Sequence, residues 1–361
     1  MNPNIEISNI YTHFFLYTEP KNDDDDGTTT VNKSKYNTRL VTYCFHSTNE
    51  ANISNQIKNI PYYSNYYDIV EDYDFINICQ LNEKYIEKLD LNHENRYLVF
   101  KYKNNNLIQF HDFLFSIRNP KVFILNTIES FNYILKGVIQ LNENNICFFN
   151  LSPKTIAFNL DCGDKPCIQH FQDSILISKL NETYITNIIN SIDDFTHKPL
   201  EIHILFYIIK NEISTISYIF IEEICDIFIK NVTVLQLFPS HYTESYKASC
   251  IEYLQKYINK PKTYIIHDIL QQHDKWDVYS LSLLYLHLFG NISRVFCLKQ
   301  SFINKILAEL FKNISPNPSK RSSLQQLLKQ FDSFLHDEND WSFVNKLSFN
   351  ALSKLFDILE K

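Results

Sequence analysis

Glycine and methionine are scarce in this chain, whose 361 residues include four glycines and one methionine. Only Gly27 lies in the first hundred residues, and no G-x-G-x-x-G sequence occurs. A glycine-rich loop, whose backbone amides approach phosphate groups closely, is therefore excluded. The chain is rich instead in asparagine, isoleucine, lysine, tyrosine and phenylalanine. This bias is typical of AT-rich genomes, so the rarity of glycine by itself says little about function.

The chain also lacks an excess of positive charge and a long apolar run. Its net charge of -7 argues against a dominant nucleic-acid surface. The longest apolar run, 278–290, falls short of the ~20 residues of a membrane helix, and the N-terminus does not resemble a signal peptide. The eight cysteines are scattered along the chain, and we expect them to be reduced thiols that act as small core residues. We expect a soluble cytoplasmic protein with neither a nucleic-acid nor a membrane partner.

What is present is enough apolar material for a large core, since 45% of residues are hydrophobic and 15% aromatic. Alternating or β-branched segments predict strands at residues 4–18, 40–45, 75–81 and 97–102. Helices are predicted at 49–59, with Ser47 or Thr48 as N-cap, and at 107–116. The aspartates of residues 23–26 are interpreted as a solvated linker. No paired metal-ligand spacing occurs, and we expect no metal site.

A buried helix over 120–141 leads into the segment 146–173. Apolar residues precede Asn150, Pro153 fixes a turn, and Ile156 and Phe158 begin a hairpin that turns through 161–164. A loop held by apolar side chains on both sides is built to present polar groups.

This segment resembles the catalytic and metal-binding loops of eukaryotic-type protein kinases. The sequence Phe148-Phe149-Asn150-Leu151-Ser152-Pro153-Lys154-Thr155-Ile156 matches H-R-D-L-K-P-E-N-I at Leu151, Pro153 and Ile156, and His170-Phe171-Gln172 stands where D-F-G is expected. The resemblance implies an α+β, two-lobed fold, with a small β-rich N-lobe over 1–106 and a large helical C-lobe over 107–361.

The residues that would carry kinase chemistry are replaced. Asn150 stands for the base aspartate, Ser152 for the loop lysine, Thr155 for the metal-binding asparagine and His170 for the metal-binding aspartate. An amide is no base, and a histidine nitrogen suits magnesium poorly. Conventional ATP and magnesium chemistry is therefore not expected.

The resemblance implies that the structural residues are kept. Phe148 and Phe171 stand at two packing positions that join the lobes. Glu201, in His197-Lys198-Pro199-Leu200-Glu201, matches the glutamate of A-P-E, and Arg321 lies in a P-x-x-R motif near the end. We expect a buried ion pair between Glu201 and Arg321. Asp277, at the start of an apolar helix, is expected to hold the loop backbone, although N-capping alone would also explain it.

The N-lobe is harder to align. Lys101 and Tyr102 begin a predicted hinge that ends at residue 106. Lys33, Lys35 and Arg39 are candidates for a displaced substitute of the phosphate-anchoring lysine, and Glu50 is the candidate helix partner.

Glu201 and Asp277 lie 76 residues apart, much farther than in ordinary kinases. Apolar periodicity predicts helices at 200–209, 216–229 and 245–258, so we interpret about 205–270 as a helical insertion. Such an insertion resembles those of kinase-like proteins from large DNA viruses. A viral origin would place the protein in the host cytoplasm or the virion.

We expect a catalytically impaired pseudokinase that acts as a regulator or scaffold by binding a protein. The first alternative is an active Ser/Thr kinase that uses ATP and magnesium, with Asp173 or Asp161 replacing the lost metal ligand. The second is a helical interaction protein that binds no nucleotide.

Overall fold

The computed structural model describes most of the chain. The described residues are 5–8, 14–17, 36–76, 96–192, 194–298, 301–337 and 347–360, with backbone pairing alone for the first two ranges. The aspartates 23–26, the candidate cations Lys33 and Lys35, and the end of the strand predicted at 75–81 lie outside them.

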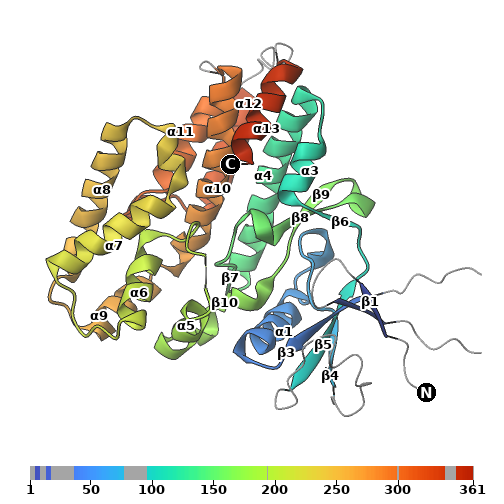
Figure 1. Cartoon of the computed structure of the whole chain (residues 1–361), viewed down its shortest axis with the longest axis horizontal. Coiled ribbons are helices and arrows are strands. Elements are labelled where there is room, and N and C mark those ends of the chain that lie inside the picture. The colour runs from blue at the N-terminus through green and yellow to red at the C-terminus, as the bar shows by residue number, and fades with distance from the viewer. Residues whose placement is uncertain are drawn as a thin grey trace, which may run out of the picture.

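A five-stranded antiparallel sheet forms one end of the molecule (Figure 1). Its strands are β1 (Ile5–Ser8), β2 (Phe14–Tyr17), β3 (Tyr36–Thr42), β4 (Asp72–Ile76) and β5 (Tyr97–Lys103). They are arranged in the order β1-β2-β3-β5-β4, and every neighbouring pair is antiparallel. The strand predicted at 97–102 is confirmed, and those predicted at 40–45 and 75–81 are confirmed in part, since β3 ends at Thr42 and β4 begins at Asp72.

The helix α1 (Phe45–Ile57) packs on this sheet. Its Ala51 is buried in one cluster with Val70, Leu98 and Phe100. The predicted boundary between strand and helix was wrong, because β3 ends at Thr42 and Phe45 is already helical. Ser47 is not the N-cap either. Its hydroxyl accepts a hydrogen bond from the backbone N–H of the N-cap residue Cys44 at 2.9 Å, which stabilises a helix start three residues earlier.

The connection from the sheet to the helical part is shorter than predicted. Lys101 and Tyr102 lie inside β5, paired with Thr38 and Asn37 of β3. The assignment of these two residues to a hinge is therefore corrected: the ladder continues through Lys103 because period-two alternation does not stop at Lys101. Residues 104–106 alone join β5 to the next strand.

Helices make up most of the remaining chain, so the α+β class is confirmed. They are α3 (Phe110–Ser116), α4 (Pro120–Glu143), α5 (Glu182–Ile189), α6 (Leu200–Lys210), α7 (Tyr218–Asn231), α8 (Ser240–Leu254), α9 (Lys262–Leu270), α10 (Trp276–Phe296), α11 (Ile303–Asn313), α12 (Leu324–Asp337) and α13 (Phe349–Leu359).

The long helix α4 runs through the core beside α10. Asn119 caps it by accepting a hydrogen bond from the backbone N–H of Lys121, and Pro120 occupies its first turn. Tyr285 of α10 donates a hydrogen bond to Ser130 of α4 at 2.9 Å, with both groups buried. By length and composition α4 could also cross a membrane, but 61% of its most apolar window is buried inside the protein. Such burial is typical of a core helix.

Three helices were predicted between residues 200 and 258, and the structure contains α6, α7 and α8 there. The helix α8 begins at Ser240, five residues before its predicted start, and α9 was not predicted. Figure 1 shows α6 to α9 gathered on the side of the molecule away from the sheet.

Two small sheets position the central loop. One pairs β7 (Ile146–Cys147) with β10 (Ile175–Leu176). The other contains β6 (Leu107–Gln109), β8 (Ile156–Asn159) and β9 (Lys165–Ile168) in the order β6-β8-β9. The predicted hairpin is thus confirmed, and Gly163 in its turn has a φ of 73°, which favours glycine.

Candidate functional site

The loop after β7 is held at its start by a buried carboxylate. Asp277, in the first turn of α10, accepts hydrogen bonds from the backbone N–H groups of Phe148 at 2.8 Å and Phe149 at 2.7 Å. Asp277 is 2% exposed. Burial raises its pKa, while the two backbone N–H donors oppose that rise. The predicted contact between Asp277 and the loop backbone is confirmed.

Two residues of the site have left-handed backbone although neither is glycine. Phe149 has a φ of 66° and His170 a φ of 67°. Such conformations cost about 1–3 kcal/mol each and persist where the surroundings enforce them. Burial of the Phe149 ring, 5.4 Å from that of Trp276 between centroids, enforces the first.

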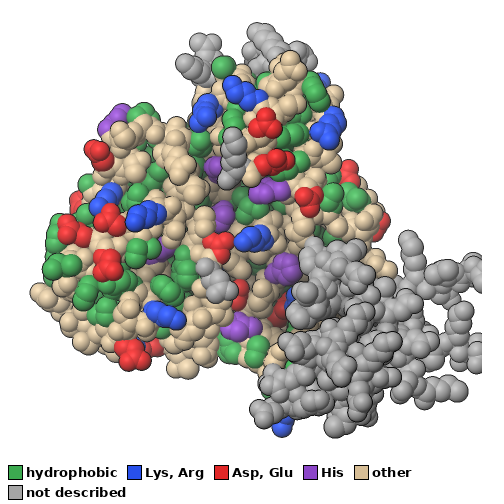
Figure 2. All heavy atoms as spheres, viewed as in Figure 1, with side chains coloured by type: hydrophobic (Ala, Val, Ile, Leu, Met, Phe, Trp, Pro, Cys, Tyr) green, Lys and Arg blue, Asp and Glu red, His purple; other side chains and the backbone are tan. Residues whose placement is uncertain are grey.

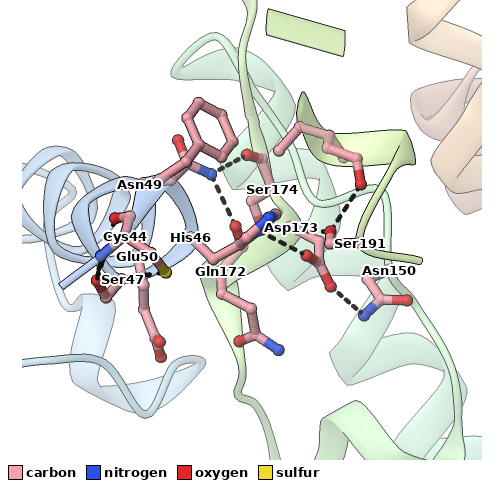
Figure 3. Close-up of polar contacts among 12 residues, drawn as sticks. Cys44, His46, Ser47, Asn49, Glu50, Asn150, Gln172, Asp173, Ser174 and Ser191 are labelled. Carbon is pink, nitrogen blue, oxygen red and sulfur yellow. Dashed lines mark hydrogen bonds and ion pairs between the residues drawn. The ribbon is translucent and has the colours of Figure 1, made fainter. Parts of the chain in front are cut away.

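Asn150 has both ends of its amide engaged. Its Nδ2 donates to Asp173 Oδ2 at 3.0 Å, and its Oδ1 accepts from Lys198 Nζ at 3.1 Å. Figure 3 shows the first of these contacts beside α1. An amide cannot accept a proton as a base at neutral pH, and this one is held between a carboxylate and an ammonium group.

Lys198, in the segment before α6, is buried beneath the loop. Its Nζ donates to the backbone oxygen of Phe149 at 2.5 Å and lies 4.1 Å from the centroid of the Phe149 ring. Burial lowers the pKa of Lys198 to about 8, although the negative charge of Asp173 opposes the shift. The sequence did not identify this residue as part of the site. The signal that could have identified Lys198 was its position in the same motif as Glu201, three residues earlier.

A pocket of about 300 Å³ opens beside the loop. The residues that line it are Asn150, Ser152, Lys154, Thr155, His170, Gln172, Asp194, His197 and Lys198. Five of them were singled out from the sequence, and the structure brings them together. Lys154, Asp194, His197 and Lys198 were not singled out.

The remaining predicted site residues lie elsewhere. The Phe171 ring is buried and meets Phe148 edge-on at 5.2 Å between centroids, so it serves packing and does not line the pocket. Lys101 forms ion pairs with Asp72 and Asp74 on the outer strand of the sheet.

Thr155 uses its hydroxyl inside the loop. The oxygen accepts from the backbone N–H of Ser152 at 3.0 Å, and the hydroxyl lies 3.0 Å from the backbone oxygen of Asn150. This hydroxyl stabilises the turn and is not directed at a ligand.

The pocket does not fit a magnesium ion. Burial and the positive charge of Arg39 lower the pKa of His170 to about 4, so it offers a neutral ring nitrogen where magnesium prefers oxygen. His197 is similar, with a pKa lowered to about 4 by burial. In the described part of the chain, no group of three histidine, cysteine, aspartate or glutamate side chains is arranged to hold a metal.

The two aspartates considered as substitute metal ligands are already engaged. Asp173 accepts from Asn150 and forms a 3.4 Å contact with His46 Nδ1 of α1. Asp161 lies in the hairpin turn, where it accepts a hydrogen bond from the backbone N–H of Asn106 at 2.8 Å, and it does not line the pocket.

The helix α1 is attached to the segment that follows His170 (Figure 3). Asn49 Nδ2 donates to the backbone oxygens of Gln172 at 2.9 Å and Ser174 at 2.8 Å. The Tyr184 hydroxyl donates to Asn49 Oδ1 at 2.5 Å. These contacts tie the sheet end of the molecule to the pocket wall.

The same helix carries the predicted partner of a strand cation. Arg39 of β3 donates to Glu50 Oε2 at 2.5 Å, and the Tyr102 hydroxyl donates to Glu50 Oε1 at 3.1 Å. The Arg39 guanidinium also stacks on the rings of Phe100 and Tyr102. Of the three proposed cations, Arg39 is the one the structure describes, and it contacts Glu50.

Glu201 and Arg321 form the predicted ion pair. Arg321 donates to the two carboxylate oxygens of Glu201 at 2.6 and 3.0 Å, and neither side chain is exposed. Arg321 Nε donates further to the backbone oxygen of Ser315 at 2.9 Å, and its guanidinium lies over the Tyr279 ring. The pair therefore joins the start of α6 to the segment before α12.

Comparison of the chain with models of known protein families gives no match, and comparison with curated proteins gives none either.

Proposed function

We propose that the chain is a protein-kinase-like pseudokinase that acts as a regulator or scaffold by binding another protein. The observation that carries the proposal is the state of Asn150. In the loop that resembles a kinase catalytic loop, an amide stands at the base position, bonded on one side to Asp173 and on the other to Lys198. The proton acceptor that phosphoryl transfer to a hydroxyl requires is absent from that position.

The surrounding scaffold supports the kinase-like part of the proposal. A five-stranded sheet with α1 on it stands beside a helical part, as a two-lobed kinase-like fold requires. Asp277 holds the loop backbone, and Glu201 pairs with Arg321. Arg39 and Glu50 supply a strand-to-helix ion pair where a kinase has one. Residues 205–270 would then be an insertion in the larger lobe, formed mainly by α7, α8 and α9.

Loss of catalytic groups alongside an intact scaffold favours a binding role. Four positions that would carry charge or metal ligands hold Asn150, Ser152, Thr155 and His170. Loss of one group that stabilises charge in the transition state raises the activation barrier by on the order of 3 kcal/mol. A protein that only binds still needs the buried supports that hold the loop in place.

A thermal-shift titration with ATP, with and without magnesium or manganese, tests the proposal. A ligand that binds the native state alone stabilises it by RT ln(1 + [L]/Kd), about 2.7 kcal/mol at a hundred times Kd. We expect little or no shift and no dependence on metal. A large metal-dependent shift, with autophosphorylation, would support the active-kinase alternative.

A further inference from the structure

The wall of the pocket contains a buried ammonium group, that of Lys198. Lys198 is 2% exposed, and among the described residues no carboxylate lies within ion-pair distance of its Nζ. Its two acceptors, the backbone oxygen of Phe149 and Oδ1 of Asn150, are both neutral. An ammonium group carries three N–H donors, so one remains after these two bonds. A buried charge left in this state favours an anionic ligand.

Further donors line the same pocket. His170 and His197 are neutral at pH 7, and a neutral imidazole carries one N–H donor. Neither ring forms a side-chain hydrogen bond to another residue in the described ranges. Gln172 Oε1 is buried and has no partner among the described residues.

The charge of the lining is positive. The lining holds two lysines and one aspartate, which gives +1 with neutral histidines. The aspartate, Asp194, lies at the exposed rim and forms a 3.5 Å ion pair with Lys154, whose side chain is 82% exposed. Asp173 is not among the lining residues. Its Oδ2 accepts a hydrogen bond from Asn150 at 3.0 Å, and its Oδ1 lies 3.4 Å from His46 Nδ1. Its negative charge acts on Lys198, but burial still lowers the pKa of Lys198 to about 8, so the ammonium group remains incompletely compensated.

We infer that this pocket binds the dianionic phosphate group of a phosphorylated serine or threonine side chain, or free phosphate, without a divalent metal. Lys198 supplies a buried positive charge to the phosphate, and the exposed Lys154 supplies a second positive charge at the rim. His170 and His197 supply neutral N–H donors. About 300 Å³ is enough for a phosphorylated side chain to enter. Cationic side chains recognise phosphate through charge-assisted hydrogen bonds. The inference rests on the proposed binding role of the protein.

Calorimetric titrations of the full chain in EDTA test the inference with three probes. These are inorganic phosphate, a phosphoserine peptide and the same peptide without phosphate. We expect binding of at least one phosphate-bearing probe and none of the unmodified peptide. Tighter binding of the phosphopeptide assigns the site to a phosphorylated partner, and equal or tighter binding of inorganic phosphate assigns it to the free ion.

Variants locate the binding in this pocket. Lys198→Met should weaken it about tenfold or more, as the loss of a charge-assisted hydrogen bond implies. Lys136→Met, which removes an exposed lysine of α4 outside the pocket, should leave it unchanged. Asp194→Asn should strengthen binding several-fold by removing the carboxylate of the lining. A gain of affinity is not a result that damage to the fold produces, so this variant remains informative if Lys198→Met unfolds.

Absence of binding by either phosphate-bearing probe, a requirement for magnesium, or unchanged affinity in Asp194→Asn would overturn the inference. Metal-dependent transfer of phosphate from ATP, measured separately, would overturn the proposed function instead. The two failures are therefore distinguishable.

Discussion

Arg321 and Glu201, 120 residues apart in the chain, meet through two parallel hydrogen bonds in an environment from which solvent is excluded. The planar guanidinium matches both carboxylate oxygens, and its remaining Nε–H is satisfied by Ser315. Burial of a charge pair is favourable only when its hydrogen bonds are this complete.

Removal of one partner should therefore be costly. We expect Arg321→Ala to lower the free energy of unfolding by about 3–5 kcal/mol, because Glu201 is left as an unpaired buried charge. Chemical denaturation measures the change. Lys320→Met, which removes the exposed neighbouring charge, is the matched control and should have little effect. An unchanged stability of Arg321→Ala would refute the importance of the pair for the fold.

The carboxylate of Asp277 should be equally hard to replace. Asp277→Ala leaves the buried N–H groups of Phe148 and Phe149 without acceptors, at about 1–3 kcal/mol each. Asp274→Ala, three residues earlier and about half-exposed, is the control and should cost less than about 1 kcal/mol. Equal melting temperatures for the two variants would show that Asp277 acts only as a local helix residue.

Lys198 makes stability depend on pH in the alkaline range. Its pKa is about 8 in the folded protein and near 10.5 when unfolded. Between these values the unfolded state binds more protons, so the stability contributed by this group rises with pH. Relative to Lys198→Met, which cannot titrate, the wild-type protein should gain on the order of 3 kcal/mol between pH 8 and 10.5. Urea unfolding of both proteins across that range measures the gain, and parallel pH profiles would contradict it.

The attachment of α1 to the pocket wall should depend on Asn49. Asn49→Ala removes two donated bonds, to the backbone oxygens of Gln172 and Ser174, and the acceptor of the Tyr184 hydroxyl. We expect hydrogen exchange in α1 and in residues 171–176 to accelerate by at least tenfold, since two donated hydrogen bonds are lost and each is worth about 1 kcal/mol. Asn52→Ala, on the exposed side of α1, should not change exchange at 171–176. Equal exchange in both variants would show that packing alone holds the helix.

The sequence predicted two kinds of feature correctly. The contacts of Asp277, Glu201 and Arg321 were expected from the resemblance of their segments to kinase motifs, and the structure contains them. The long helix α4 and the hairpin of β8 and β9 were predicted from hydrophobic periodicity and turn residues.

The sequence did not predict features that depend on contacts between residues far apart in the chain. Nothing around Lys198 indicates that a lysine would be buried, because burial of this charge depends on acceptors 48 and 49 residues away. The strand β5 continues into the predicted hinge because β3 pairs with it as far as Tyr36 and Lys103. The helix α9 is only nine residues long, too short for a clear periodic signal.

Transfer of the γ-phosphate of labelled ATP is the most direct test of whether the loop at Asn150 has lost its chemistry. The purified full chain would be incubated with magnesium or manganese, alone and with general protein substrates, beside Asn150→Ala and Asp173→Asn. We expect the wild-type protein to incorporate no more label than either variant. Metal-dependent incorporation by the wild-type protein that disappears in Asp173→Asn would contradict the pseudokinase proposal and establish an active kinase.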